Sequence, residues 1–386
     1  MQLVFSDAQY WEDFLPLTFT KPVAEMRMGI LTFAERWKKL LSIDEVCYIT
    51  EDYLQEKFVK PSPKQSLFVV PNFFPSDEVL NQIKNLKAGE ALVYKNEVLA
   101  ANINMDKFSL NQIEKMTDIT EELMFIEKPT DIFSYNDFAI NYDFKLVTEG
   151  RISQELSSTN GFLGEKENLF IEEGATIEFS TINCKTGKIY IGKNAEIMEG
   201  SNIRGSLALC EESKINLGTK LYGATTIGPH SKVGGEVNNI VIFGYSNKGH
   251  DGFVGNSVIG EWCNLGADTN SSNLKNNYDS VKLWNYRQKR FVDTGLQFAG
   301  LIMGDHSKTA INTQLNTGTV VGVASNIFKS GFPPNLVDNF SWGGMKGDEK
   351  FKLEKSYEVA EKAMERRKIP LTDVDKNILK YIYNEF

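Results

Sequence analysis

The sequence predicts an α/β domain followed by a left-handed parallel β-helix and two C-terminal helices. Short apolar segments alternate with helix-like segments over the first 150 residues. An aliphatic residue then recurs at every sixth position, and a charged amphipathic stretch follows a connector that contains Pro, Asn and Gly. We therefore expect an α/β domain at 1–150, a β-helix at 151–331, and a connector with capping helices at 332–386.

The first domain contains apolar segments that are bounded by polar or Pro-containing sequence, as strands are. Helix-like segments lie between them, and this alternation favours a parallel sheet that is covered on both faces. The expected strands are Leu3–Phe5, Glu45–Ile49, Leu67–Val70 and Ala91–Tyr94, and the expected helices are Leu31–Leu41, Ser76–Leu86 and Phe133–Phe138.

The period of six is unbroken over eight successive positions. Small residues stand four positions after most of these aliphatic residues. The same phase returns at Phe253, Ile259 and Leu265, and again at Leu315, Val321 and Ile327. The unbroken series is Ile191, Ile197, Ile203, Leu209, Ile215, Leu221, Ile227 and Val233.

A hexapeptide repeat has a direct structural cause. Three six-residue strands form one triangular coil, and stacked coils place the aliphatic residue of each strand inside a prism. A single helix repeats every 3.6 residues and a single strand every 2, so neither holds an inward period of six. The repeat therefore indicates a left-handed parallel β-helix.

One stretch, 268–294, interrupts the repeat. It is rich in Asn, Lys, Arg and aromatic residues, and long excursions from a solenoid usually lie on one face and carry binding. A plain solvated loop is the alternative, although Tyr278, Trp284, Tyr286 and Phe291 are costly residues to leave in water. After the repeat, 350–368 is amphipathic, and Thr372 with Asp375 resembles a helix capping box.

Composition excludes several classes of function. The 42 basic and 51 acidic residues give a net charge of −9, which argues against binding to nucleic acid or to an anionic membrane surface. No apolar run approaches the roughly 18 residues of a membrane-spanning helix. Four widely separated Cys without a CxxC pair fit neither a zinc ribbon nor a disulfide framework. We expect a protein of the reducing cytoplasm.

Histidine is the natural general base, and the chain has three: His230, His250 and His306. All three fall at corners of the predicted coils, so their position does not discriminate among them. His250 differs in its context, because the hexad frame is briefly lost there and Asp251 follows directly. A neutral imidazole on an exposed ledge beside a carboxylate suits proton transfer near neutral pH.

The run KGHDGFVGNSVIGEWCNLGADT resembles the acetyltransferase half of the bifunctional bacterial glucosamine-1-phosphate N-acetyltransferase/N-acetylglucosamine-1-phosphate uridylyltransferase family. The resemblance implies that His250 is the catalytic base. It also implies substrate contacts from Asn277 and Tyr278, with Asn273 competing for the same role. The segment GDHSKTAINTQLNTGTV, which contains Thr313, is similar to the coils of that family that bind acetyl-CoA, and Gly266 and Ala267 are candidates for backbone contacts.

The basic residue that holds the sugar phosphate in this family aligns with Asn238 here. Either another residue holds the phosphate or the acceptor is a different amino sugar. Lys248, Lys275 and Arg287 are the candidates for replacement, and Lys248 is the nearest to the expected base.

The N-terminal domain lacks the Gly-rich phosphate loop of the family and has LPLTFTKPVAEMRMGILT at 15–32 instead. That segment, with SWGG at 341–344, resembles a variant, Bacteroidetes-type group of the bifunctional enzyme. Lys21 and Arg27 could bind a nucleoside triphosphate, and Asp7 could hold Mg²⁺. Each of the three could equally be a surface charge.

The resemblance implies a homotrimer that acetylates a sugar phosphate with acetyl-CoA and couples this to nucleotidyl transfer, giving UDP-N-acetylglucosamine. Three alternatives stay open: a non-catalytic sugar-nucleotide-binding or regulatory protein, a glucose-1-phosphate thymidylyltransferase-like enzyme, and a trimeric zinc hydratase of the γ-carbonic anhydrase kind. The sequence spacing of the histidines disfavours the last, because two of its zinc ligands lie close together in sequence.

Overall fold

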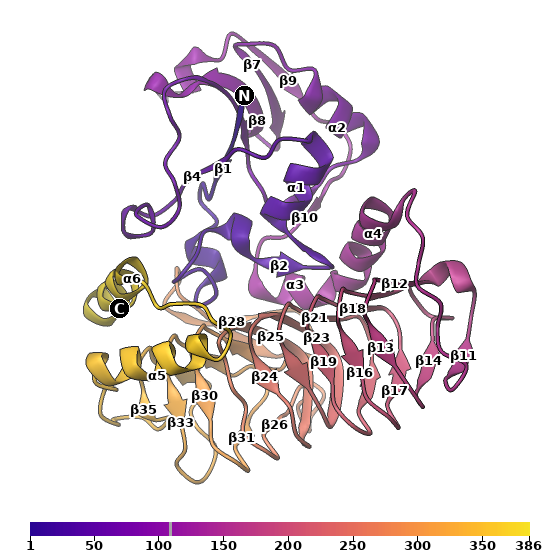
Figure 1. Cartoon of the computed structure of the whole chain (residues 1–386). Coiled ribbons are helices and arrows are strands. Elements are labelled where there is room, and N and C mark those ends of the chain that lie inside the picture. The colour runs from indigo at the N-terminus through magenta and orange to yellow at the C-terminus, as the bar shows by residue number, and fades with distance from the viewer. Residues whose placement is uncertain (108–109) are drawn as a thin grey trace. The chain divides into compact units, whose positions relative to one another are not determined.

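The chain forms two units whose segments interleave along the sequence (Figure 1). The computed structural model describes residues 1–107 and 110–386. The first unit comprises Met1–Phe14, Thr20–Met26 and Leu31–Glu127, and the second comprises Leu15–Phe19, Arg27–Ile30 and Lys128–Phe386. The second unit therefore starts before the predicted boundary at 150, because the helices α3 (Pro129–Ser134) and α4 (Asn136–Thr148) pack with the β-helix.

The first unit is built on a mixed sheet, not on the purely parallel sheet that the sequence predicted. β1 pairs in parallel with β4 and β5, but β8 runs antiparallel to both β5 and β7. Lys95 and Asn96 have positive φ angles of 48° and 68° and turn the chain directly from β7 into β8. The strand order is β4 (Val46–Ile49), β1 (Gln2–Ser6), β5 (Gln65–Val69), β8 (Glu97–Asn104), β7 (Glu90–Tyr94) and β9 (Lys115–Asp118).

Two of the three helices predicted for the N-terminal domain, Leu31–Leu41 and Ser76–Leu86, are confirmed within two residues at each end. The third prediction, Phe133–Phe138, is wrong in its bounds, because Tyr135 separates α3 from α4. α1 (Phe33–Leu41) begins at a capping box between Thr32 and Glu35, and α2 (Asp77–Lys84) begins at Ser76, whose hydroxyl accepts the Val79 N–H. The remaining short strands of this region are β2 (Arg27–Met28), β3 (Leu31–Thr32), β6 (Phe73–Phe74) and β10 (Met124–Phe125).

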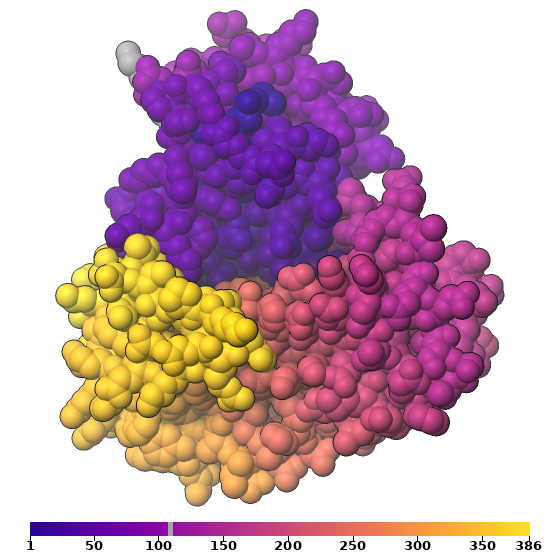
Figure 2. All heavy atoms as spheres, in the orientation of Figure 1, coloured from indigo at the N-terminus to yellow at the C-terminus, as the bar shows by residue number. Residues whose placement is uncertain are grey.

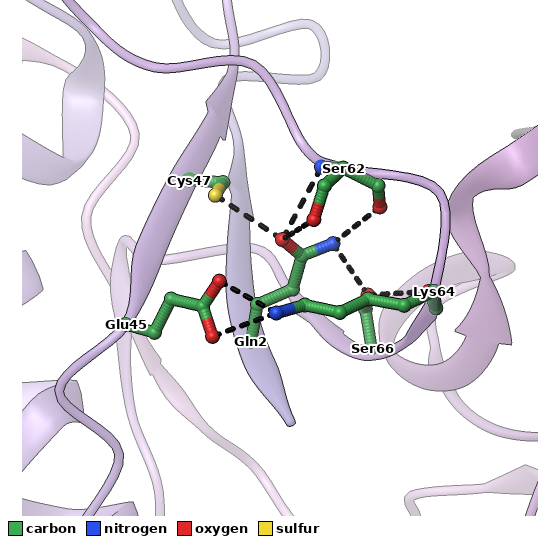
Figure 3. Close-up of polar contacts among 6 residues, drawn as sticks. All are labelled: Gln2, Glu45, Cys47, Ser62, Lys64 and Ser66. Atoms are coloured by element: carbon green, nitrogen blue, oxygen red, sulfur yellow. Dashed lines mark hydrogen bonds and ion pairs between the residues drawn. The ribbon is translucent and has the colours of Figure 1, made fainter.

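The buried Gln2 amide fastens β1 to its neighbours (Figure 3). Its nitrogen donates to the Ser62 carbonyl and to Ser66 Oγ, both at 2.8 Å. Its oxygen accepts from the Ser62 backbone and hydroxyl and from the Cys47 thiol. This network satisfies a polar group that burial would otherwise penalise, and it holds the 62–66 segment on the sheet.

The β-helix is confirmed, and its core is the ladder of aliphatic residues that the period of six predicted. Corresponding strands of successive coils pair in parallel and in register, as with Ile197 on Ile215 and Ile215 on Val233. Two faces contain β11 (Gly161–Leu163), β12 (Leu169–Ile171), β14 (Thr181–Asn183), β15 (Ile189–Ile191), β17 (Asn202–Arg204), β18 (Leu207–Leu209), β20 (Lys220–Tyr222), β21 (Thr225–Ile227), β23 (Glu236–Gly244), β25 (Phe253–Glu261), β26 (Asn270–Ser271), β29 (Ile302–Met303), β31 (Gln314–Leu315), β32 (Val320–Val321) and β34 (Leu336–Val337). The third face contains β13 (Thr176–Ile177), β16 (Glu196–Ile197), β19 (Lys214–Ile215), β22 (Lys232–Val233), β24 (Asn247–Lys248), β30 (Lys308–Thr309), β33 (Asn326–Ile327) and β35 (Trp342–Gly343).

One inward position differs from the prediction. Phe253 is only partly buried, and Val254 takes the core position opposite Val237. The cause is a shortened coil: Leu209 pairs with the residue eighteen positions later, whereas Ile227 pairs with Ile242, fifteen positions later. The frame therefore shifts before Phe253 is reached.

The excursion from the β-helix begins later than the sequence predicted. Asn270 and Ser271 still pair with neighbouring coils, and the chain leaves the solenoid after Ser272. It forms a hairpin of β27 (Lys282–Asn285) and β28 (Arg290–Asp293) and returns at Ala299, whose N–H donates to the Asn273 carbonyl. The hairpin gives the aromatic residues of this stretch partners, as with Trp284 against Phe291.

The two C-terminal helices are confirmed as α5 (Leu353–Glu365) and α6 (Asp373–Glu385), and the Thr372–Asp375 capping box is present. In Figure 2 the C-terminal residues, in yellow, lie over the late coils of the β-helix. Met364 and Ala360 of α5 pack on Trp262 in a separate hydrophobic cluster. Within the described residues, none of the helices combines the length and apolar character that crossing a bilayer requires.

Candidate active site

His250 lies at an exposed corner of the β-helix, two residues after the end of β24, and lines a pocket of about 540 Å³. Turns of neighbouring coils form the rest of the pocket lining. Met198 and Leu217 make one part of the lining apolar, and Asp251 and Asp268 make another part acidic. The lining residues are Met198, Asn216, Leu217, Gly234, Gly235, Gly249, His250, Asp251, Ala267 and Asp268.

Glycines form the floor of this pocket because the coils approach too closely for side chains. A Cβ at Gly234 would lie 2.6 Å from the Gly249 carbonyl oxygen. Gly235 has a φ of +73°, which L side chains rarely adopt. Asn216 donates to the Gly249 carbonyl at 2.7 Å and ties the turn that carries His250 to an earlier coil.

The two acidic side chains of the pocket come from adjacent coils. The Asp268 N–H donates to the Asp251 carbonyl at 3.0 Å, and both side chains are exposed. None of the lining residues, all in the described part of the chain, is Lys or Arg. The pocket is therefore suited to an amine or another cationic group, and it offers no cation to a phosphate.

Lys248, a predicted phosphate contact, faces the interior of the β-helix. It is 2% exposed, and its ammonium donates to the carbonyls of Gly234, His250 and Asp251 at 2.9, 2.5 and 3.2 Å. Burial lowers the pKa of Lys248 to about 8, and the carboxylates of Asp251 and Asp268 oppose that shift. Because all three N–H groups are used, the geometry gives Lys248 a structural role and not a phosphate contact.

The other two histidines lie at a different corner of the β-helix. His230 stacks on Tyr245 at 5.1 Å between ring centroids, and His306 lies at the far end of the same row, 6.4 Å from Trp262. All four residues have positive φ angles, so they occupy the same turn position in successive coils. Only His250 lines the pocket, which separates it from the two residues that the sequence left equivalent.

The residues expected to contact acetyl-CoA also differ in whether they line the His250 pocket. Ala267 lines the pocket, but the Gly266 N–H already donates to the carbonyl and hydroxyl of Thr309 at 3.1 Å. Thr313 is 7% exposed, and its hydroxyl donates to the Ala310 carbonyl. Of these three residues, only Ala267 is placed to contact a ligand beside His250.

The expected substrate contacts of the excursion do not line the His250 pocket. Asn273 donates to Asn256 Oδ1 at 2.7 Å, and Asn277 donates to Asp279. Tyr278 is 66% exposed. The ammonium of Lys275 donates to the Ser280 carbonyl and lines a larger pocket of about 1200 Å³ beside the excursion, none of whose lining residues is His.

In the first unit, Asp7 is buried and both of its oxygens accept hydrogen bonds. The Val23 N–H donates to one oxygen at 2.7 Å, and the Thr50 hydroxyl donates to the other. Burial raises the pKa of Asp7 to about 7, against the opposing effect of these two bonds. A carboxyl group in this state is a weak ligand for Mg²⁺, so these residues do not fit the predicted metal site. The described residues contain no group of three or more His, Cys, Asp or Glu that could hold a metal.

Lys21 and Arg27, expected to bind one triphosphate, belong to different units. Lys21 is buried in the first unit at 5% exposure. Arg27 is buried in the second unit, where it donates to the Phe243 carbonyl at 3.1 Å and to the Ile30 carbonyl. The structure therefore gives Arg27 a role in fastening the 27–30 segment to the β-helix.

Asp268 and Asn216 also belong to the site, although the sequence did not predict them. The coil register contains the signal for both. Ile215 pairs with Val233, which places Asn216 beside Gly234. Asn247 bridges to Asn264 and Val254 pairs with Ser271, so residues of the His250 turn lie beside those seventeen positions later. This register places Asp251 beside Asp268.

Residues 2–152 match the family described as sugar nucleotidyl transferase. The chain is 33% identical over 144 residues to a bifunctional sugar-1-phosphate nucleotidylyltransferase/acetyltransferase of Sulfurisphaera tokodaii. The aligned stretch covers 37% of this chain and 35% of that protein. It is 36% identical over 104 residues to the bifunctional protein GlmU of Methanocaldococcus jannaschii, and this aligned stretch covers 27% of this chain and 24% of that protein. The chain thus spans about a third or less of the length of these relatives.

Among solved structures, the polySia-specific acetyltransferase NeuO is similar over 54% of this chain and 94% of that chain, at 12% identity and a TM-score of 0.27. A likeness at that score adds nothing to the observed fold, whose strand pairing stands by itself. The resemblance inferred from the sequence is confirmed by the match of residues 2–152 and by the bifunctional relatives. Residues 2–152 therefore match the sugar nucleotidyl transferase family, and the chain is similar over part of its length to bifunctional nucleotidylyltransferase/acetyltransferases.

Proposed function

We propose that this chain transfers an acetyl group from acetyl-CoA to the amine of an amino-sugar phosphate, with glucosamine 1-phosphate as the favoured acceptor. The observation that carries the proposal is the His250 pocket, where an exposed imidazole and two carboxylates stand on a β-helix. The names of the bifunctional relatives, which combine sugar-1-phosphate nucleotidyl transfer with acetyl transfer, support it.

The chemistry follows from the charge of the pocket. An amino sugar arrives as an ammonium ion, which Asp251 and Asp268 attract. His250 Nδ1 or Nε2 accepts the proton, and the free amine attacks the thioester carbonyl carbon. The C–N bond forms, the C–S bond breaks, and the CoA sulfur leaves with the proton of the imidazolium. The neutral imidazole then accepts the second proton of the amine nitrogen and releases it to solvent, which leaves a neutral amide. Ala267 is the remaining candidate for the backbone N–H that stabilises the oxyanion, because the Gly266 N–H is used within the coil.

The phosphate of the acceptor lies outside this pocket in our proposal, because no Lys or Arg of the described chain lines it. A homotrimer would bring residues of a neighbouring β-helix to the His250 pocket. We propose substrate contacts from Asn273, Asn277 and Tyr278 only in that assembly. Sedimentation that shows a stable monomer at micromolar concentration would remove this part.

For residues 2–152 we propose nucleotidyl transfer to N-acetylglucosamine 1-phosphate, with UTP as the favoured donor and dTTP as the alternative. The family match supports this proposal. The burial and bonding of Arg27 and Asp7 do not support roles for these two residues, whereas a contact of Lys21 with the triphosphate stays a prediction. Both reactions use metabolites of the cytoplasm, which is the compartment that we propose.

The experiment is an assay of CoA release with a panel of amino sugars, with and without the 1-phosphate. His250→Ala should lower kcat by roughly 10² to 10⁴-fold without loss of thermal stability. His230→Ala is the control, because this imidazole stacks on Tyr245 at another corner. A wild-type protein without CoA release on any acceptor supports the non-catalytic alternative, and a fully active His250→Ala removes His250 from the mechanism.

The second half has a separate assay, in which pyrophosphate release is measured from UTP or dTTP with N-acetylglucosamine 1-phosphate and Mg²⁺. Release with either nucleotide supports the bifunctional proposal and names the donor. If no nucleotide gives release, only the acetyltransferase proposal stands.

A further inference from the structure

Lys248 occupies a position in the β-helix core that aliphatic residues hold in the neighbouring coils. The inward ladder of this face runs through Ile197, Ile215 and Val233, and Val233 then pairs with Lys248. Asn247 bridges to Asn264, so Leu265 follows Lys248 in the same ladder. An ammonium at such a position must recover the free energy of desolvation through hydrogen bonds.

The three carbonyls that accept these hydrogen bonds all belong to residues that line the His250 pocket. Gly234 comes from the preceding coil, whereas His250 and Asp251 form the turn itself. A single side chain therefore joins the floor of the pocket to the two residues that carry its base and one of its carboxylates.

The local sequence explains why this turn needs such a fastening. Gly249 and Gly252 stand on either side of His250 and Asp251, and Gly252 has a φ of +106°. Glycines allow the chain to follow the tight corner, but they leave the backbone many conformations. Three bonds to one buried ammonium select one of these conformations.

We propose that Lys248 is a positioning residue that fixes the His250–Asp251 backbone and thereby aims the His250 imidazole into its pocket. This inference rests on the proposed acetyltransferase function of the same site. Lys248 touches neither substrate in this proposal, and it acts through the carbonyl groups of the turn.

The protonation state of Lys248 supplies an independent readout. Its pKa is lowered to about 8 by burial, while the facing carboxylates of Asp251 and Asp268 favour the charged form. His250, exposed at the same turn, is the third titratable group nearby. Above pH 8 the neutral amine has only two N–H groups for three carbonyls, so the turn loosens as the pH rises.

The test substitutes Lys248→Met in the full chain, because a linear apolar side chain of similar length fits an aliphatic ladder. We expect thermal stability that is unchanged or raised and a kcat that falls about 10- to 100-fold, with KM for acetyl-CoA and acceptor within a few-fold of wild type. The decline of wild-type kcat above pH 8 should be absent from the variant.

Lys350→Met is the control. The Lys350 ammonium also donates to a backbone carbonyl, that of Tyr383, and burial also lowers its pKa. It does not line the His250 pocket, so its replacement should leave kcat and the alkaline limb of the pH profile unchanged.

Three results would overturn the proposal: a Lys248→Met kcat within twofold of wild type, an alkaline limb that persists in the variant, or an equal loss in Lys350→Met. If Lys248→Met does not fold, Lys248→Gln keeps two N–H donors and should give a smaller kcat loss with the alkaline limb removed. The proposed function fails separately, through a fully active His250→Ala.

Discussion

Asp143 of α4 accepts a hydrogen bond at 2.9 Å from the backbone N–H of Ile30, although 113 residues separate them in the chain. Asn136 accepts the neighbouring Gly29 N–H at 2.9 Å, and Thr226 of the β-helix donates to the Gly29 carbonyl at 2.8 Å. These bonds make residues 27–30 a built-in part of the second unit.

Gly29 permits this contact because it has no side chain. Its φ is +76°, and a Cβ there would lie 2.8 Å from the carbonyl of Ala139. Gly29→Ala should therefore lower the free energy of unfolding by at least about 1 to 3 kcal/mol, measured by urea denaturation. Gly150→Ala is the control for backbone strain alone, because Gly150 has a φ of +72° but open space around it. Equal losses in the two variants would contradict the packing argument.

Replacement of Arg27 should affect stability and not nucleotide affinity. Arg27→Met leaves the buried carbonyls of Phe243 and Ile30 without their donor. The free energy of unfolding, measured in urea, should therefore fall by about 2 kcal/mol. Below the unfolding transition, the KM for UTP in pyrophosphate release should match wild type. Arg204→Met, at an exposed position, should change neither quantity. A raised KM with unchanged stability would restore Arg27 as a phosphate contact.

Asp7 should make the stability of the first unit depend on pH. Because its pKa is raised to about 7 in the folded state, the folded protein binds more protons than the unfolded chain above pH 3.8. The stabilisation from this group is complete below pH 3.8 and is lost as the pH rises through about 7.

Asp7→Asn removes that titration while it keeps an oxygen that can accept the Val23 N–H. We expect the wild type to lose stability relative to Asp7→Asn as the pH rises from 4 to 8. The relative loss in the free energy of unfolding, measured by urea denaturation, should reach up to a few kcal/mol. Asp44→Asn, at a fully exposed carboxylate, should show no such trend. A wild-type curve parallel to that of the variant would show that Asp7 titrates normally.

Trp262 should hold α5 on the β-helix. It is 9% exposed, stacks on Tyr245 at 4.3 Å between ring centroids, and packs against Met364. Trp262→Ala should cost about 3 kcal/mol and should speed proteolytic cleavage near α5. Phe179→Ala removes an aromatic ring that is 66% exposed and should leave the digestion pattern as it is. Unchanged digestion of Trp262→Ala would mean that α5 is held elsewhere.

The β-helix could be predicted because its signal is local and periodic. Each inward residue from Ile191 to Val233 repeats the same environment, so the pattern alone specifies the coil. The Phe253 position could not be predicted, because a single shortened coil shifts the frame and only the pairing of Ile227 with Ile242 reveals it. The antiparallel strand β8 was missed for a related reason: the Lys95–Asn96 turn lacks the Gly that marks most tight hairpins.

The candidate site was predictable at His250, whose sequence context distinguished it, but the roles of nearby cations were not. Lys248, Lys21 and Arg27 read alike in the sequence as available positive charges. Their function depends on burial and on carbonyl partners, such as that of Phe243 for Arg27, which lie far along the chain. Residue type alone therefore does not separate a ligand-binding cation from one that holds the backbone.

The interleaving of the two units has a consequence for how the chain is made. A ribosome releases Leu15–Phe19 and Arg27–Ile30 long before the coils that receive them, since Phe243, the partner of Arg27, is synthesised 216 residues later. The first unit can gather most of its own strands early, but these two segments must stay available until the β-helix grows past them. A protein that starts at residue 128 would contain every coil but would lack the two segments that pack on them. The second unit is thus completed by two segments that are synthesised well before its own coils.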